Sequence, residues 1–213
     1  MPTRAIKICG ISTAETLEAV IAARADYVGF VFYPPSPRHV RPSLAAQLGA
    51  RAAGRIKRVG LFVDASDAEI AEAVAAAGLD ALQLHGHETP ARAAQLKAMT
   101  GLSVWKAVPV ACPDDVTGAA DFADAADQIL FDAKTPKGTL PGGMGLSFDW
   151  SLLAAWKNRV AWGLAGGLTP DNVAEAVRLT SAPLVDTSSG VESAPGVKDI
   201  GKIAAFCSAV RSA

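Results

Sequence analysis

The sequence predicts an α/β fold, a single-domain (βα)8 TIM barrel in which eight parallel strands close into one sheet. Eight short runs rich in Val, Ile, Leu and Phe recur along the 213 residues. Their starts lie about 22 to 32 residues apart, which leaves room for a strand, a helix and two short loops. The segments between the runs show the 3.6-residue periodicity of helices. Eight similar βα units favour a closed barrel over an open doubly wound sheet, the other architecture with parallel strands and right-handed crossovers.

The apolar runs are the predicted strands. Side chains alternate between the two faces of a strand, so Lys7 and Cys9 should share one face of the first strand. Ile6 and Ile8 should then lie on the other face, packed against the helices. The eight runs cover residues 5–9, 27–32, 57–63, 81–84, 103–108, 128–132, 160–164 and 183–186.

Each strand should be followed by a helix, and capping residues mark where several of these helices begin. Residues 68–77 are rich in alanine, which favours helix, and Gly78 follows as a common helix stop. The fifth helix should be short or irregular, because residues 113–127 include Pro113 and Gly118. The predicted starts are Ser12 or Thr13 for the first helix, Ser66 and Asp67 for the third, and the Thr169-Pro170-Asp171 triplet for the seventh.

The composition excludes several classes of protein. The chain has 20 Lys and Arg against 21 Asp and Glu, a formal net charge of -1. This balance provides no broad cationic surface, so we expect neither nucleic acid nor a membrane as a partner. No stretch approaches the roughly 18 consecutive apolar residues that span a bilayer. Three cysteines without a CxxC pair suit a reducing compartment, so we expect a cytoplasmic protein.

Active sites in (βα)8 barrels form at the carboxyl ends of the strands. The first strand ends with Lys7 and Cys9. A lysine beside a cysteine should lower the pKa of the thiol, which makes Cys9 a candidate base or nucleophile. The alternative is that Cys9 is a small buried apolar residue. Polar residues also end three other strands and should face the same rim: Gln83 and His85 on the fourth, Asp132 on the sixth and Asp186 on the eighth.

Asp132 is a candidate general acid. It directly precedes residues 133–147, a glycine-rich segment long enough to act as a lid that excludes water. The alternative is that Asp132 caps a turn or pairs with a neighbouring lysine such as Lys134. Asp186 is placed equally well, but the hydroxyl groups that follow it offer local hydrogen bonds, so we assign it a supporting role.

Two glycine-containing segments follow the seventh and eighth strands, where barrels of this type often bind phosphate through backbone amides. Glycine permits that close approach. A single Gly-Gly pair also serves ordinary turns, but two such loops on adjacent strands favour a phosphate site. Its candidate residues are Gly166, Gly167, Ser188, Ser189 and Gly190.

Arg38 and the histidines complete the set of candidates. Three prolines in residues 34–40 limit the freedom of that loop, which suits a guanidinium held for bidentate binding of a carboxylate. The alternative is a solvated arginine. His85 and His87 suggest a metal pair, but three histidines leave no evident third ligand, so we expect no metal site. We expect His85 to donate a hydrogen bond to a substrate instead.

Seven motifs lie in order between residues 7 and 199. They are Lys7-Ile8-Cys9-Gly10-Ile11, Gly29-Phe30-Val31-Phe32 with Ser36-Pro37-Arg38, Val59-Gly60-Leu61-Phe62-Val63, Leu82-Gln83-Leu84-His85-Gly86, Phe148-Asp149-Trp150, Leu164-Ala165-Gly166-Gly167-Leu168-Thr169-Pro170, and Ser188-Ser189-Gly190-Val191-Glu192. Together they resemble the phosphoribosylanthranilate isomerase family. The resemblance implies a (βα)8 barrel that needs no cofactor and catalyses the Amadori rearrangement of N-(5-phosphoribosyl)anthranilate in tryptophan biosynthesis.

The resemblance also implies roles for individual residues. Cys9 would act as general base, Asp132 as general acid, and Arg38 would hold the anthranilate carboxylate. The reaction needs an acid to protonate the ring oxygen and a base to remove a proton from the adjacent sugar carbon. Strands one and six are well separated around a barrel, so Cys9 and Asp132 can lie on opposite sides of the substrate. The other expected contacts are Lys7, Gln83, His85 and Asp186 with the substrate, and Gly166, Gly167, Ser188, Ser189 and Gly190 with its phosphate.

The chain departs from the family pattern in two places. Residues 142–145 read Gly-Gly-Met-Gly where the family usually has Gly-Gly-Thr-Gly, after a longer insert at 135–141, and Thr187 replaces the usual valine. Two other functions remain alternatives: another phosphosugar isomerase or epimerase on the same barrel, or a non-catalytic phosphoribosyl-binding barrel. We expect the substrate to be a small-molecule phosphosugar. We expect the protein to be a monomer or a homodimer.

Overall fold

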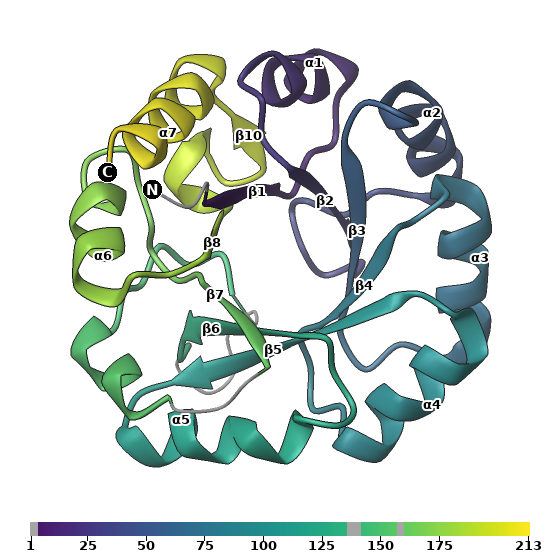
Figure 1. Ribbon diagram of the computed structural model, residues 1–213. Helices are drawn as coiled ribbons and strands as arrows, with labels where there is room; N and C mark the ends of the chain where they lie inside the picture. Colours follow the sequence, from purple (N-terminus) through teal and green to yellow (C-terminus); the bar gives the residue numbers. More distant parts are fainter. Residues whose placement is uncertain (1–3, 136–141, 157–159) are drawn as a thin grey trace.

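Eight parallel strands close into a barrel in the computed structural model, which describes residues 4–135, 142–156 and 160–213. The strands follow chain order around the ring, and the eighth pairs with the first to close it. Figure 1 shows the helices as an outer layer around the ring of strands, with the chain passing once round the barrel. The predicted (βα)8 barrel is confirmed.

Strands and helices alternate along the chain. The barrel strands are β1 (Ala5–Cys9), β2 (Tyr27–Phe32), β3 (Lys57–Phe62), β4 (Ala81–Leu84), β5 (Ser103–Val110), β6 (Gln128–Ala133), β7 (Ala161–Leu164) and β8 (Leu184–Thr187). The α-helices are α1 (Ala14–Ala22), α2 (Pro42–Ala52), α3 (Asp67–Ala77), α4 (Pro90–Thr100), α5 (Pro113–Gly118), α6 (Val173–Thr180) and α7 (Ile200–Ser212). A separate antiparallel hairpin, β9 (Glu192–Ala194) and β10 (Val197–Lys198), lies between β8 and α7.

Pairing with the neighbouring strand decides where several strands end. The fifth strand runs two residues beyond its predicted end because Val110 still pairs with Ala133 of β6. The eighth runs to Thr187, which pairs with Ile8 of β1. The predicted ends came from apolar runs alone, and such a run does not show how far its pairing with the neighbouring strand extends.

The predicted caps are confirmed for α1 and α3. The Thr13 hydroxyl, not that of Ser12, accepts a hydrogen bond from the Thr16 amide. Ser66 and Glu69 form a reciprocal capping box at the start of α3. Each cap satisfies backbone N–H groups that the first turn of a helix leaves without partners.

The helix of the seventh unit begins later than predicted. The Asn172 side chain accepts a hydrogen bond from the Thr169 amide at 2.8 Å and donates one to the Gly167 carbonyl at 2.9 Å. These bonds hold residues 169–172 in a turn, so α6 begins at Val173 and the predicted start at Thr169 is wrong.

The fifth and sixth units are the irregular ones. The helix α5 has 6 residues and continues as a 3₁₀ helix over Ala119–Phe122, which confirms the predicted short or irregular helix. In the sixth unit, where we expected an α-helix, the described residues form a 3₁₀ helix over Trp150–Ala155, capped by the Asp149 carboxylate.

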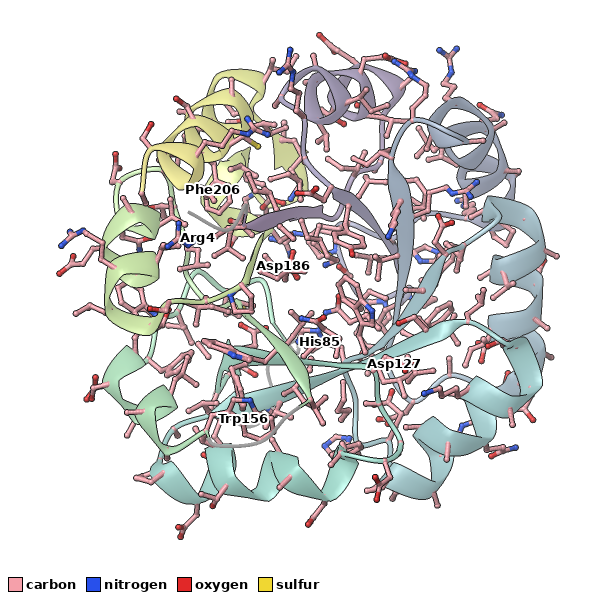
Figure 2. All side chains as sticks on the ribbon, viewed as in Figure 1. Arg4, His85, Asp127, Trp156, Asp186 and Phe206 are labelled. Atoms are coloured by element: carbon pink, nitrogen blue, oxygen red, sulfur yellow. The ribbon has the colours of Figure 1, made fainter. Side chains whose placement is uncertain are left out.

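Apolar side chains fill two layers. Ile6 and Ile8 belong to the large cluster between the strands and the helices, whereas Cys9 lies in a cluster inside the barrel, so the predicted alternation along β1 is confirmed. Figure 2 shows Phe206, a buried residue of α7, outside the ring of strands and His85 and Asp186 inside it. Burying a side chain such as Phe206 contributes about 1.5–3 kcal/mol to stability. In the part of the chain that the structure describes, no helix is long and apolar enough to cross a membrane.

Candidate active site

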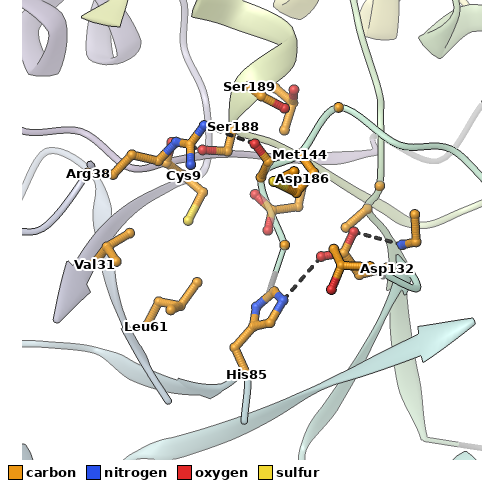
Figure 3. A pocket seen from close by; sticks show the side chains of 18 of the residues that line it. Cys9, Val31, Arg38, Leu61, His85, Asp132, Met144, Asp186, Ser188 and Ser189 are labelled. Carbon is orange, nitrogen blue, oxygen red and sulfur yellow. Dashed lines mark hydrogen bonds and ion pairs between the residues drawn. The ribbon is translucent and has the colours of Figure 1, made fainter. Parts of the chain in front are cut away.

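A cavity that is open to solvent lies at the carboxyl ends of the barrel strands. Figure 3 shows Cys9 and Arg38 on one side of it and Asp132 on the other. The sequence therefore predicted the location of the cavity correctly, from the rule that polar residues ending parallel strands share one rim. The predicted site residues that line it are Cys9, Arg38, Gln83, His85, Asp132, Gly166, Gly167, Asp186, Ser188 and Ser189.

Two predicted residues do not line this cavity. Lys7 is completely buried beneath it, 0% exposed, and has no surface for a ligand to reach. Gly190 lines a neighbouring hollow, together with Gly167 and Ser189, which border both spaces. The candidate phosphate loops thus face the junction of the cavity and this hollow.

Lys7 and Asp186 form a buried ion pair. The Lys7 ammonium lies 2.7 Å from Asp186 Oδ2, and the two residues are paired in register between β1 and β8. Burial alone would lower the pKa of Lys7, but the Asp186 carboxylate and the Cys9 thiol raise it above its ordinary value. Among the described residues, the other oxygen, Asp186 Oδ1, has no hydrogen-bond partner. This oxygen is itself buried in the cavity wall that Asp186 helps to form.

The environment of Cys9 differs from the prediction. We expected Lys7 to lower the pKa of the thiol, but burial raises that pKa above its ordinary value and the Lys7 charge offsets only part of the effect. The main physical reason is burial, which removes the water that would stabilise a thiolate, and the negative charge of Asp186, the partner of Lys7, disfavours the thiolate further. The prediction of an acidified thiol is therefore wrong, while the position of Cys9 in the cavity wall agrees with a reactive role.

Asp132 is held by two hydrogen-bonding groups. Its Oδ1 accepts a hydrogen bond from the Ala133 amide at 2.8 Å, and its Oδ2 lies 3.2 Å from His85 Nε2. The suggested pairing with Lys134 does not occur, because Lys134 contacts Asp115 instead. Asp132 is thus fixed at the cavity wall, as Figure 3 shows.

Gln83 orients the imidazole of His85. The Gln83 amide nitrogen lies 3.1 Å from His85 Nδ1. When this amide donates to Nδ1, the ring proton lies on Nε2, so His85 donates to Asp132. Among the described residues, the Gln83 carbonyl oxygen has no partner, although it is buried in the cavity wall. His87, by contrast, has a side chain that is 98% exposed and contacts Asp64.

His85 and His87 are each paired with an aspartate. His85 contacts Asp132 and His87 contacts Asp64, so the two histidines take different partners. Within the described ranges of the chain, no group of three or more His, Cys, Asp or Glu residues is arranged to hold a metal ion.

The candidate phosphate loops require glycine at two positions. Gly166 has a positive φ of 83°, and a Cβ there would lie 2.5 Å from the Ala133 amide nitrogen. A Cβ on Gly190 would overlap the carbonyl of Leu168. Backbone this close to its neighbours leaves no room for a side chain at either position.

Arg38 is buried rather than solvated. Its side chain is 8% exposed, and its Nε and Nη2 each lie 2.8 Å from a different carboxylate oxygen of Glu192. The Nη2 group also donates to the Gly143 carbonyl at 3.1 Å. The alternative of a solvated arginine is therefore wrong, and the guanidinium connects the loop after β2 with the segment after β6.

Glu192, the last residue of the seventh motif, and Lys198 were given no role from the sequence, yet both lie in the ion-pair network of Arg38. The Lys198 ammonium lies 2.7 Å from Glu192 Oε1, and it donates to the Ser188 carbonyl at 2.8 Å. A signal was present in the sequence. Pro195-Gly196 predicts a turn, and the two charged residues flank it at positions that pair in the hairpin of β9 and β10.

The segment after β6 reaches over the cavity. Gly142, Gly143 and Gly145 all have positive φ, and residues 142–146 line the cavity, as expected of a covering segment. Met144, where the family usually has threonine, is among them. Most of the longer insert noted at 135–141 lies outside the described residues.

Known proteins match this chain over almost its whole length. A family model described as N-(5'phosphoribosyl)anthranilate (PRA) isomerase matches residues 6–209. The N-(5'-phosphoribosyl)anthranilate isomerase of Paracoccus denitrificans is 56% identical over 202 residues, which cover 94% of each chain. That of Paramagnetospirillum magneticum is 52% identical over 207 residues, covering 97% of this chain and 96% of the relative.

Solved structures agree with these relatives. Phosphoribosyl anthranilate isomerase from Thermotoga maritima has a TM-score of 0.85 at 34% identity, covering 99% of this chain and 100% of the other. A second structure, an isomerase in complex with reduced 1-(o-carboxyphenylamino)-1-deoxyribulose 5-phosphate, has a TM-score of 0.83 at 32% identity, with the same coverage. A 3-hexulose-6-phosphate synthase, 18% identical with a TM-score of 0.68, shares the fold alone. The chain belongs to the N-(5'-phosphoribosyl)anthranilate isomerase family.

Proposed function

We propose that this chain catalyses the Amadori rearrangement of N-(5-phosphoribosyl)anthranilate to 1-(2-carboxyphenylamino)-1-deoxyribulose 5-phosphate, a step of tryptophan biosynthesis. The observation that carries the proposal is the placement of a thiol, Cys9, and a carboxyl group, Asp132, on opposite sides of one cavity. The reaction moves protons within one molecule and consumes no co-reactant, so these two groups suffice and no cofactor is required.

Asp132 is the proposed general acid. It gives its proton to the ring oxygen of the ribose as the bond between that oxygen and C1 breaks. The lone pair of the anilino nitrogen forms a C=N bond to C1, which leaves an iminium ion and an open chain. His85 and the Ala133 amide hold the two oxygens of Asp132 in place for this transfer.

Cys9 is the proposed general base. As a thiolate, it removes the proton from C2 of the iminium ion. The electrons of that C–H bond form a C1=C2 bond, and the π electrons of the C1=N bond return to the nitrogen as its lone pair. The resulting enol converts to the ketose when a proton is added at C1 and the C2 hydroxyl proton leaves. Lys7, held by Asp186 beneath the cavity, is the nearest cation to the thiolate and favours its formation.

The other predicted residues bind the substrate in this proposal. The unpartnered oxygens Gln83 Oε1 and Asp186 Oδ1 can accept hydrogen bonds from sugar hydroxyl groups. Arg38 holds the anthranilate carboxylate, and Lys7 acts indirectly by holding Asp186. The phosphate lies against the backbone of Gly166, Gly167, Ser188, Ser189 and Gly190.

We also infer how the chain is organised. Residues 1–213 form one catalytic barrel domain that acts in the cytoplasm on a small-molecule phosphosugar, as a monomer or homodimer, without a nucleic-acid or membrane partner. Both forms have a precedent, since a related structure is described as monomers generated from the dimeric Thermotoga maritima enzyme. The presence of both proton-transfer groups in one cavity favours catalysis over a non-catalytic phosphoribosyl-binding barrel.

A coupled fluorescence assay tests the proposal. The upstream transferase makes phosphoribosylanthranilate from anthranilate and phosphoribosyl pyrophosphate, and the loss of its fluorescence is followed after this protein is added. We expect turnover by the wild type, and a fall in kcat of about 10²-fold or more in Cys9→Ala and in Asp132→Asn. Cys112→Ala, which removes an exposed thiol, is the matched control. A folded wild type without turnover, or a Cys9→Ala variant with normal kcat, would contradict the proposal.

A further inference from the structure

Three charged side chains are buried together beside the proposed carboxylate site. Arg38, Glu192 and Lys198 are 7%, 8% and 8% exposed. Removing charges from water is costly unless each is paired. The arrangement Arg38–Glu192–Lys198, with one carboxylate between two cations, satisfies that condition and leaves a net positive charge.

Glu192 fixes the orientation of the Arg38 guanidinium. Its Nε and Nη2 groups donate two parallel hydrogen bonds to the Glu192 carboxylate, and the second N–H of Nη2 donates to the Gly143 carbonyl. Among the described residues, Nη1 has no hydrogen-bond partner. A Cβ on Gly143 would lie 2.5 Å from Nη1, so the backbone packs closely against it. The geometry leaves Nη1 as the group with free N–H donors for a ligand in the cavity.

The pairing with Glu192 also has an electrostatic cost. An arginine paired with a glutamate is neutral overall and attracts an anion weakly. Burial alone would raise the pKa of Glu192, but the hydrogen bond from Arg38 and the charge of Lys198 lower it below its ordinary value, so Glu192 is ionised near neutral pH. A second cation is needed if the site is to favour a carboxylate.

Lys198 supplies that cation. Its ammonium contacts three acceptors, Glu192 Oε1 at 2.7 Å, the Ser188 carbonyl at 2.8 Å and Ser188 Oγ at 3.1 Å. An ammonium group has three N–H donors, so each is matched. Burial lowers the pKa of Lys198, against the effect of Glu192, but these three acceptors favour the charged form.

We propose that Lys198, acting through Glu192 and Arg38, gives the carboxylate site its net positive charge, while Glu192 fixes the guanidinium that holds the carboxylate. Both are positioning residues, since Lys198 does not line the cavity and the carboxylate of Glu192 is occupied by the two cations. The inference rests on the proposed role of Arg38 and deepens it. It predicts that Lys198 affects recognition of a carboxylate rather than of the sugar or phosphate.

Two inhibitors that differ by one carboxylate test this inference. The first is reduced 1-(o-carboxyphenylamino)-1-deoxyribulose 5-phosphate, and the second is the same compound without the ring carboxylate. The ratio of their inhibition constants measures the preference for the carboxylate. Lys198→Gln removes the charge and retains a hydrogen-bonding group, whereas Lys198→Met removes both and fills a similar volume. Lys97→Met, which removes an exposed lysine paired with Asp127, is the control for net charge.

We expect the ratio to fall by about tenfold in both Lys198 variants, because a charge-assisted contact is weakened, and to stay unchanged in Lys97→Met. Binding of the inhibitor without the carboxylate should hardly change. An unchanged ratio in both Lys198 variants would overturn the inference. Equal weakening of both inhibitors would also overturn it, since Lys198 would then only support the Ser188 loop. A ratio near one in the wild type would instead refute the role of Arg38 on which the inference rests.

Discussion

Lys7 and Asp186 face each other across the closing seam of the barrel, paired in register between β1 and β8 and 2.7 Å apart. The side chain of Lys7 is 0% exposed and that of Asp186 is 7% exposed. Burial raises the pKa of the nearby Cys9 thiol. The Lys7 charge lowers that pKa only in part, and the Asp186 charge acts against it.

Removing one member of this pair should destabilise the protein. Lys7→Met leaves Asp186 buried without its counter-ion, which we expect to lower the free energy of unfolding by about 3 kcal/mol. The double variant Lys7→Met/Asp186→Asn should recover much of that loss. Urea denaturation provides the measurement. The exposed pair of Lys97 and Asp127 is the control, where Lys97→Met should cost under about 1 kcal/mol. A loss no larger than in that control would show that the pair is not a structural one.

The Cys9 thiol should titrate above the ordinary cysteine range. Burial raises its pKa, so the thiolate forms only as the pH rises past the usual value of about 8.5. The difference in ultraviolet thiolate absorbance between wild type and Cys9→Ala isolates this group from the other two cysteines. A titration that is complete below pH 8 would contradict the raised pKa.

Glu192 should contribute to stability against acid. Burial alone would raise its pKa, but Arg38 and Lys198 lower it, so the folded state binds a proton less readily than the unfolded chain does. Its contribution is present above the unfolded pKa of about 4.3 and is lost as the pH falls through the lower folded value. Unfolding free energies of wild type and Glu192→Gln, measured from neutral to acidic pH, should converge below that range. Curves that stay parallel would show that Glu192 does not carry this dependence.

His85 should affect catalysis through Asp132. In His85→Ala, Asp132 Oδ2 loses the imidazole that holds it, and we expect kcat to fall by about 10- to 100-fold. His87→Ala is the matched control, because that side chain is almost fully exposed and contacts Asp64 instead. Steady-state kinetics of both variants test the prediction, which fails if the two behave alike.

The sequence was informative where structure follows local periodicity. Strand spacing predicted the barrel, and the alternation of side chains placed Cys9 inside it and Ile8 outside. The rule that parallel strands end at one rim brought together Asp132 and His85, although the bond between them was not foreseen.

What the sequence did not reveal depends on contacts through space. The pKa of Cys9 is set by burial and by the pairing of Lys7 with Asp186, 179 residues away. The roles of Glu192 and Lys198 appear only once their hairpin lies beside Arg38. The start of α6 depends on one side chain, Asn172, which caps a turn that the Thr169-Pro170 signal did not distinguish from a helix.

The seam between β1 and β8 also affects how the protein is made. Lys7 is synthesised well before its counter-ion Asp186, which lies 179 residues further along the chain on the strand that closes the barrel. Until then, a partly made barrel would have an open edge on β1 and a lysine without its partner, next to the thiol. The part of the cavity wall that contains Cys9 and Asp186 therefore forms only after β8 has been made and has paired with β1.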